Sequence, residues 1–330
     1  MTACELTDLL EQVDGNYIEE ATIQYKRVRR KKRVWLIAAA VISALAITTA
    51  AASYYLNLTG YLQKNGMQDV SGAQMLQENL MESFSTELAD FKVLEAVRDR
   101  DMIYVVTEIK PRQEGDMLIP EFVIPSKSVQ ELNIEGVTEG TIEDYAEEQE
   151  KRLVVAGAGL MNFDSTTIDA HCTADGSMYV YITTSFGENR DHLEVQGFTE
   201  NPETRELEHV SREVPLQDQS SAKEMVFETF DSKLGPEVHV TPIRLTFRET
   251  ELGLQVSFTY QGDPERASNI HFCSVVDSEG KELSHMPGAV GNVDDNQDGT
   301  YTSVAYYQKV SSYEGLALKF AHHGPYSFSK

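Results

Sequence analysis

Residues 91–109 of the chain read FKVLEAVRDRDMIYVVTEI, and this stretch indicates how the chain folds. Two runs rich in valine, isoleucine and aromatic side chains flank the charged segment Arg98–Asp101. Such runs favour extended strands, whereas a short charged segment between them is typical of a turn. The stretch therefore predicts a β-hairpin within a fold that is mainly β with some α.

The residues around this hairpin predict an α+β domain over residues 57–220. Before the hairpin, the apolar residues of 71–88 recur every three or four positions, which predicts an amphipathic helix. After it, residues 141–152 predict a surface helix, because Thr141 can cap the helix together with Asp144. Further strands are expected at residues 153–156, 166–172, 177–185, 192–199 and 207–214.

The end of the chain predicts a second domain over residues 235–330. The polar segment of residues 217–223 is typical of a linker and places the boundary near residues 215–235. Beyond it, short strands alternate with turns, at residues 238–240, 243–248, 252–260, 269–277, 300–308 and 316–322. This pattern is typical of an immunoglobulin-like β-sandwich.

Residues 34–56 read VWLIAAAVISALAITTAAASYYL and predict one transmembrane helix. The segment carries no charge, and crossing a hydrocarbon core of about 30 Å needs about 20 such residues. Seven bases come immediately before it: Lys26, Arg27, Arg29, Arg30, Lys31, Lys32 and Arg33. This one-sided charge predicts a cytoplasmic N-terminus and an extracellular region after residue 56. The rival interpretation is a cleaved signal peptide ending near residues 50–52, although the apolar run exceeds the usual length of about 7–15 residues.

Charge is divided unevenly along the chain and limits the classes of partner. The chain has 53 acidic and 28 basic residues, and after residue 56 the balance is 47 acids against 21 bases. Such an acidic region repels phosphates, which argues against direct binding of nucleic acid. The basic run before the predicted span suits anionic membrane lipid instead. We therefore expect membrane lipid and an unknown extracellular ligand among the partners.

The sequence offers no constellation typical of catalysis or of metal binding, so we expect neither an enzyme nor a cofactor. The histidines lack the spacing of metal ligands. Residues 294–299, DDNQDG, match the first half of a calcium loop, but Ala305 occupies the twelfth position, where such a loop has glutamate. We interpret this segment as a hairpin turn. Whether Cys172 and Cys273 form a disulfide stays open at this point.

The cytoplasmic segment of residues 1–33 carries an apolar stripe suited to a partner. Its side chains recur at helical spacing at Leu6, Leu9, Leu10 and Val13, and the pattern resumes at Tyr17 and Ile18 after the break at residues 14–16. So short a segment cannot bury these side chains in a core of its own. We therefore interpret them as partner-binding residues of an amphipathic helix. The alternative is a tail that only delivers the basic run.

The order of these features resembles a family of bacterial membrane proteins. Residues 5–10 (ELTDLL) and 13–21 (VDGNYIEEA), the basic run, the single span and the acidic β-rich exterior are similar to anti-sigma-factor-like single-pass membrane proteins of low-GC Gram-positive bacteria. The resemblance implies a sigma factor as the cytoplasmic partner. The zinc-binding anti-sigma type carries a histidine and a Cys-x-x-Cys motif, whereas residues 1–33 contain no histidine and a single cysteine.

Two functions are compatible with these patterns. In the first, the protein is a membrane regulator whose extracellular region senses or anchors while residues 1–25 hold a cytoplasmic partner. In the second, the protein is a surface-displayed binding or adhesion module, and its N-terminus is a simple membrane anchor.

Overall fold

The structure is a computed structural model that describes residues 57–134, 137–161, 166–185, 192–216, 221–230, 240–262, 273–320 and 323–329. The apolar stripe of residues 6–18, the basic run of residues 26–33 and the predicted span of residues 34–56 lie outside the described residues. Within the described ranges, no helix combines the length and the apolar character needed to cross a bilayer.

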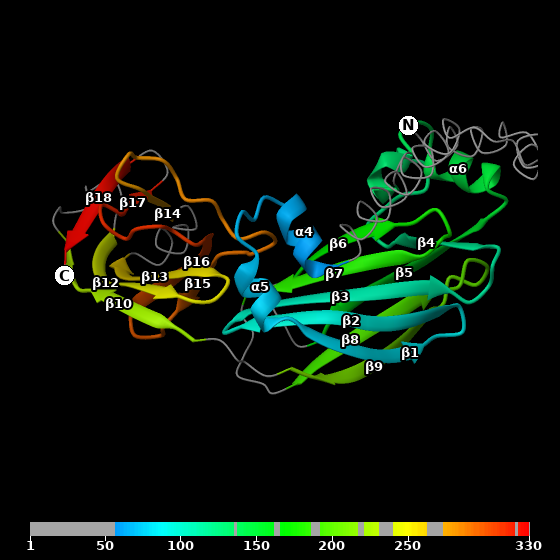
Figure 1. Cartoon of the computed structure of the whole chain (residues 1–330), viewed down its shortest axis with the longest axis horizontal. Coiled ribbons are helices and arrows are strands. Elements are labelled where there is room, and N and C mark those ends of the chain that lie inside the picture. Colours follow the sequence, from blue (N-terminus) through cyan, green and yellow to red (C-terminus); the bar gives the residue numbers. More distant parts are fainter. Residues whose placement is uncertain are drawn as a thin grey trace, which may run out of the picture.

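The described chain is mainly β, with a few short helices and four sheets (Figure 1). This coarse prediction is confirmed. We call the described residues of 57–216 the first half and those of 221–329 the second half. The first half contains sheet 1 and sheet 2, and the second half contains sheet 3 and sheet 4. The predicted domain limits of 57–220 and 235–330 stay predictions.

Sheet 1 is built on the predicted hairpin, which is confirmed. Strands β2 (Ala89–Asp99) and β3 (Met102–Pro111) pair antiparallel across a turn at Arg100 and Asp101, where Arg100 has a φ of 58°. The sheet has the order β1-β2-β3-β7-β6. Its other strands are β1 (Glu78–Ser85), β7 (Met178–Thr184) and β6 (Thr166–Cys172).

Sheet 2 packs on one face of sheet 1 through a shared hydrophobic core. It has the order β4-β5-β8-β9, with strands β4 (Asp116–Pro120), β5 (Arg152–Leu160), β8 (His192–Glu200) and β9 (Leu207–Pro215). β4 pairs parallel with β5, and the other pairs are antiparallel. Phe91 and Val105 of sheet 1 meet Leu118, Val154 and Val195 of sheet 2 in this core, which gives the first half its own buried interior.

The predicted helix over residues 71–88 is wrong in its second part. α5 (Ser71–Leu76) is helical, but β1 begins at Glu78, and its side chains alternate between half-buried and exposed. Leu80 and Phe84 are four residues apart, and this spacing puts them on one face of a strand as well as on one face of a helix. The apolar pattern alone therefore could not separate the two structures.

The predicted helix over residues 141–152 exists but is shorter. α6 (Ile142–Glu148) has the expected capping box, in which Thr141 Oγ1 accepts a hydrogen bond from the Asp144 backbone N–H at 3.1 Å. The Asp144 carboxylate accepts in return from the Thr141 backbone N–H at 3.2 Å. Arg152 does not end this helix. It begins β5, where its guanidinium lies 2.9 Å from the buried Asp116 carboxylate.

The second half consists of two antiparallel sheets with a core between them. Sheet 3 has the order β10-β12-β13-β16-β15, with β10 (Lys223–Phe227), β12 (Val240–Glu249), β13 (Gly253–Gly262), β16 (Thr300–Gln308) and β15 (Asn292–Asp295). Sheet 4 has the order β11-β18-β17-β14, with β11 (Thr229–Phe230), β18 (His323–Ser329), β17 (Ala317–Phe320) and β14 (Cys273–Val276). Phe247 and Phe258 of sheet 3 pack with Val275 and Leu318 of sheet 4.

The hairpin turn predicted at residues 294–299 is confirmed. β15 and β16 pair antiparallel, and the chain turns between them with a φ of 86° at Gly299. The Asp298 carboxylate accepts a hydrogen bond from the Thr300 backbone N–H at 2.9 Å, which fixes the turn. The aspartates of this segment thus have a local structural role.

Gly197 of β8 allows sheet 2 to approach two stacked rings of sheet 1. The rings of Phe84 and Phe91 stack with centroids 5.2 Å apart, and a Cβ atom at residue 197 would lie 2.6 Å from the Phe91 ring. We expect Gly197→Ala to lower the free energy of unfolding by about 1–3 kcal/mol, as overpacking does. Chemical denaturation of the full chain in detergent, followed by circular dichroism, measures this loss.

The matched control is Gly115→Ala, because a Cβ atom at residue 115 would meet no atom within 4 Å. An equal loss of stability in both variants would contradict the steric explanation.

Candidate functional site

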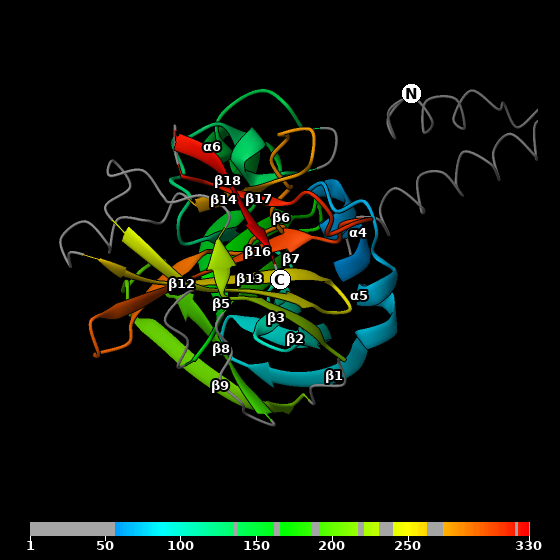
Figure 2. The ribbon, with the colours of Figure 1, turned by 90° about the vertical axis from the view of Figure 1, so that its left-hand side faces the viewer.

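Two short helices connect the halves at the point where the described chain begins. α4 (Leu58–Lys64) and α5 lie between the halves in Figure 1, and Figure 2 shows both on one side of the molecule. They share a buried cluster that we call the joint core. It consists of Leu58, Tyr61, Leu62, Met67, Val70, Ala73 and Leu76 from the helices and their loop, Val97, Met102, Tyr104, Val106, Tyr179 and Tyr181 from sheet 1, and Leu252, Met286, Val304 and Tyr306 from the second half.

α4 is held against sheet 1 from its first residue. The Asn57 side chain caps the helix by accepting a hydrogen bond from the Gly60 backbone N–H at 2.7 Å. The Leu58 backbone N–H donates to the Glu95 carboxylate at 2.8 Å, and Glu95 belongs to β2. One turn later, the Tyr61 ring stacks on the Tyr181 ring with centroids 4.2 Å apart. The described chain thus begins at a fixed position on sheet 1.

α5 is held against the second half by close backbone contact. Gly72 faces the turn between β12 and β13, and a Cβ atom at residue 72 would lie 1.9 Å from the Glu251 carbonyl oxygen. Only glycine permits this approach. The loop between the helices is also attached to the second half, because Gln308 Nε2 donates to the Gly66 carbonyl at 2.9 Å. The Gln68 backbone N–H donates to Gln308 Oε1 at 3.3 Å.

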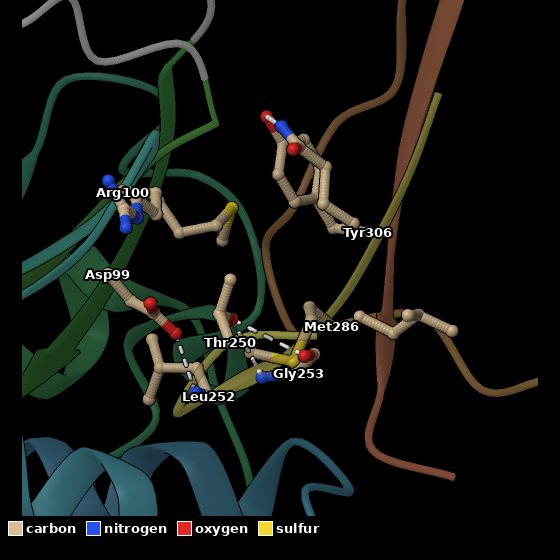
Figure 3. A pocket seen from close by; sticks show the side chains of 10 residues that line it. Asp99, Arg100, Thr250, Leu252, Gly253, Met286 and Tyr306 are labelled. Atoms are coloured by element: carbon tan, nitrogen blue, oxygen red, sulfur yellow. Dashed lines mark hydrogen bonds between the residues drawn. The ribbon is translucent and has the colours of Figure 1, made fainter. Parts of the chain in front are cut away.

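Direct hydrogen bonds join sheet 1 to the second half around the joint core. The Asp99 carboxylate at the end of β2 accepts from the Leu252 backbone N–H at 2.5 Å, and Figure 3 shows this bond. Asp101 accepts from Gln255 Nε2 at 2.8 Å, and the buried Tyr104 hydroxyl donates to the Pro287 carbonyl at 2.9 Å. The Tyr306 hydroxyl donates to the Ser185 carbonyl. The bonds of Asp99 and Asp101 fix the turn of the β2–β3 hairpin against sheet 3.

The hollow drawn in Figure 3 is too small for an organic ligand. Its volume is about 10 Å³, and Asp99, Leu252, Met286 and Tyr306 are among the residues that line it. Such a volume holds about one water molecule. This part of the joint core is therefore suited to connecting the halves, with no room for a substrate.

A larger polar hollow of about 310 Å³ lies beside the first turn of α4. Asn57, Thr59, Gln63, Gln74 and Glu95 are among its lining residues. Glu95 is its single carboxylate, and across the residues that the structure describes no three His, Cys, Asp or Glu side chains gather to hold a metal ion. The lining otherwise offers amide and hydroxyl groups for hydrogen bonding, and Glu95 has no second titratable side chain beside it among the lining residues.

Burial changes the proton affinities of several groups in the first half. It raises the pKa of the Tyr61, Tyr104 and Tyr181 hydroxyls well above the usual range, so these tyrosines are neutral hydrogen-bonding groups. Burial also raises the pKa of the Cys172 thiol to about 12. Cys172 is a free cysteine, so it forms no disulfide with Cys273.

The structure does not place the side chains predicted to bind partners. Leu6, Leu9, Leu10, Val13, Tyr17 and Ile18, and the bases Lys26, Arg27, Arg29, Arg30, Lys31, Lys32 and Arg33, lie outside the described residues. The sequence interpretation in turn missed the joint core. The sequence does carry one signal of it, the helical spacing of Leu58, Tyr61 and Leu62. These residues follow the apolar predicted span so closely that they were not distinguished from it.

Comparison with known proteins assigns the chain to no family. No protein-family model matches it, and no curated protein matches it. Among solved structures, a conserved domain protein from Bacillus anthracis is similar with a TM-score of 0.40 and 11% sequence identity. The similarity covers 77% of this chain and 89% of that chain, and at this level it carries no argument about function.

Gly72 provides a test of the contact between α5 and the second half. We expect Gly72→Ala to move α5 away from Glu251, because the added Cβ atom would collide with the Glu251 backbone carbonyl. Limited proteolysis of the full chain in detergent should then cut near residues 65–77 at least about ten times faster, as expected for a loss of about 1.4 kcal/mol in local stability. Met75→Ala is the matched control, because Met75 lies on the same helix and is exposed. Unchanged cleavage of Gly72→Ala would refute the contact.

His171 should make the first half sensitive to acid. It lies in β6 with 8% of its surface exposed, and burial, aided by the charge of Lys64, lowers its pKa from 6.5 to about 4. The unfolded chain then binds a proton that the folded chain does not, so stability is complete above pH 6.5 and falls as the pH drops toward 4. The slope from this group is at most about 1.4 kcal/mol per pH unit.

Unfolding midpoints in urea, measured across this pH range, test the assignment. His171→Gln should flatten the dependence more than His209→Gln, which replaces an exposed side chain of β9. Equal slopes in the wild type and in His171→Gln would contradict it.

Proposed function

We propose that the chain is a single-pass membrane regulator of the anti-sigma-factor-like kind. Residues 1–33 are cytoplasmic and hold a partner, residues 34–56 cross the membrane, and the region from residue 57 onward lies outside the cell. The uncharged segment of residues 34–56 and the seven bases in front of it support this topology. We also propose that the second half is an immunoglobulin-like sandwich, an interpretation supported by its two antiparallel sheets around one core.

We retain the division into two extracellular domains as part of this proposal. The pairing of β10 with β12 and of β11 with β18 favours a second domain that starts near Lys223, earlier than residue 235. The joint core nevertheless connects the two domains, and its size favours movement of the exterior as one unit.

The observation that carries the proposal is the position of the joint core next to the predicted span. Leu58 is buried two residues after that span and belongs to a cluster that both halves share. A flexible polar linker at this place would let the exterior move independently of the predicted span. Here α4 begins two residues after the predicted span, beyond its extended N-cap Asn57, and shares the joint core with both halves. This connection is a route by which an exterior event could reach the cytoplasmic segment.

The apolar stripe of residues 6–18 is proposed as the cytoplasmic binding surface, and the resemblance names a sigma factor as its partner. Recognition would follow the helix-in-groove mode, in which residues at i, i+3, i+4 and i+7 enter an apolar groove. Two charges placed in such a groove would be desolvated without partners. We expect Leu9→Asp combined with Leu10→Asp to reduce co-purification of a co-expressed sigma factor at least about 100-fold, or about 2.7 kcal/mol.

The matched control places two aspartates on the same helix outside the apolar stripe, at Thr7→Asp and Gln12→Asp. This variant should keep its partner. Undiminished co-purification of the Leu9 and Leu10 variant would refute the binding mode.

A deletion variant distinguishes the regulator from the surface-displayed binding or adhesion module. Deleting residues 2–25 leaves the basic run and the predicted span in place. A regulator should lose its effect on transcription, whereas an adhesion module with a simple anchor should keep its surface phenotype.

A further inference from the structure

Strand β4 covers only the first part of the edge of β5. β4 pairs with residues 152–156 of β5, and the chain then leaves sheet 2 at Glu121. On its opposite edge, β5 stays paired with β8 up to Leu160. Among the described strands, none continues β4 alongside residues 157–160. Within the described part of the chain, the backbone N–H and C=O groups on that side of residues 157–160 have no strand partner, and such groups can pair with an additional strand.

A cavity of about 160 Å³ lies at this open edge, just beyond the end of β4. Phe122 lines it at the end of β4, Ile168 and Met178 line it from sheet 1, and Phe198 lines it from β8. A cavity of about this size holds a benzene molecule in an engineered protein core. It can therefore take one apolar side chain of an approaching strand.

The small residues of β5 create this space. Residues 156–159 read Ala-Gly-Ala-Gly, and they lie within β5. A Cβ atom at Gly157 would lie 2.5 Å from the Phe198 ring, so the ring can occupy its position only because residue 157 has no side chain. A Cβ atom at Gly159 would meet no atom closer than Ile168 Cδ1 at 3.9 Å. Gly159 therefore leaves room that the folded chain does not fill.

Large apolar side chains are exposed around the mouth of the cavity. Phe122 is 56% exposed and Ile168 is 38% exposed, and Ile124 is exposed two residues beyond Phe122. Grouped apolar side chains on a surface are typical of binding sites. Glu121 also lines the cavity and brings a negative charge to this part of the surface.

We propose that the open edge of β5 binds an extended peptide of a partner protein as an additional strand of sheet 2. The peptide takes the place where β4 would continue, and its backbone pairs with residues 157–160. One apolar side chain enters the cavity between Ile168, Met178 and Phe198. Glu121 and the acidic region after residue 56 select a basic residue beside this apolar anchor. The proposal concerns the exterior and does not depend on the cytoplasmic partner.

The test uses the full chain in nanodiscs of neutral phosphatidylcholine and a fluorescein-labelled peptide of sequence KVLVKG. Fluorescence anisotropy should report binding with a dissociation constant below about 1 mM. The peptide KVPVKG should bind at least about tenfold more weakly, because proline lacks the backbone N–H and the leucine side chain is gone. Empty nanodiscs control for binding to lipid.

Two substitutions test separately how the cavity and the charge of Glu121 contribute to peptide binding. Gly159→Val fills the cavity with a residue that favours strands and should weaken KVLVKG at least about tenfold. Gly115→Val is the matched control, because a Cβ atom at residue 115 meets nothing within 4 Å, and it should bind as the wild type does. Glu121→Lys should weaken binding several-fold at low salt and less at high salt. Circular dichroism verifies that each variant is folded.

Three results would overturn the proposal. The first is the absence of KVLVKG binding to the wild type at a peptide concentration of about 1 mM. The second is equal affinity of KVLVKG for the wild type and for a folded Gly159→Val variant. The third is dimerisation of the wild type that Gly159→Val abolishes, because the edge of β5 would then be occupied by a second copy of this chain.

Discussion

The burial of α4 and α5 between the two halves is the constraint on which the rest of the structure depends. Helices of seven and six residues are not stable alone, because nucleation costs more than so few hydrogen bonds return. They are helical here because Tyr61 and Leu62 are removed from water by sheet 1, and Leu76 lies in the same cluster as Leu252 and Tyr306 of the second half. The dependence is mutual, since without the helices the outer face of sheet 1 would expose Tyr104, Tyr179 and Tyr181.

Those parts of the fold whose signal is local were predictable from the sequence. The β2–β3 hairpin, β6 and β16 were found because alternating apolar residues and adjacent turns specify them within a few positions. The cap of α6 was found for the same reason. β4 was missed because its five residues lie in a parallel pair with β5, and the connection between the two runs through residues 121–151. No local pattern reveals such a partner.

The candidate site was less accessible to sequence reasoning than the fold. Tyr61 lies 120 positions before its stacking partner Tyr181, and Gly72 meets Glu251 across most of the described chain. From the sequence alone, the reason for a glycine in a short helix cannot be inferred, because the carbonyl that it contacts is far away in the chain. The Ala-Gly-Ala-Gly segment of β5 is a similar case. In the structure it lies inside a strand, gives the Phe198 ring its place and leaves one edge of that strand open.

The attachment of Gly66 and Gln68 to Gln308 has a consequence for the order in which the protein matures. Synthesis starts at the N-terminus, so residues 57–76 leave the ribosome long before the residues that hold them. Sheet 1 can assemble once β7 has emerged, but the loop after α4 must wait for β16, near the end of the chain. The segment next to the predicted membrane helix is therefore made before the rest of the described chain but reaches its final contacts last. A molecule whose synthesis stops before β16 would form the hairpins of sheet 1 but lack the hydrogen bonds from Gln308 to the loop after α4.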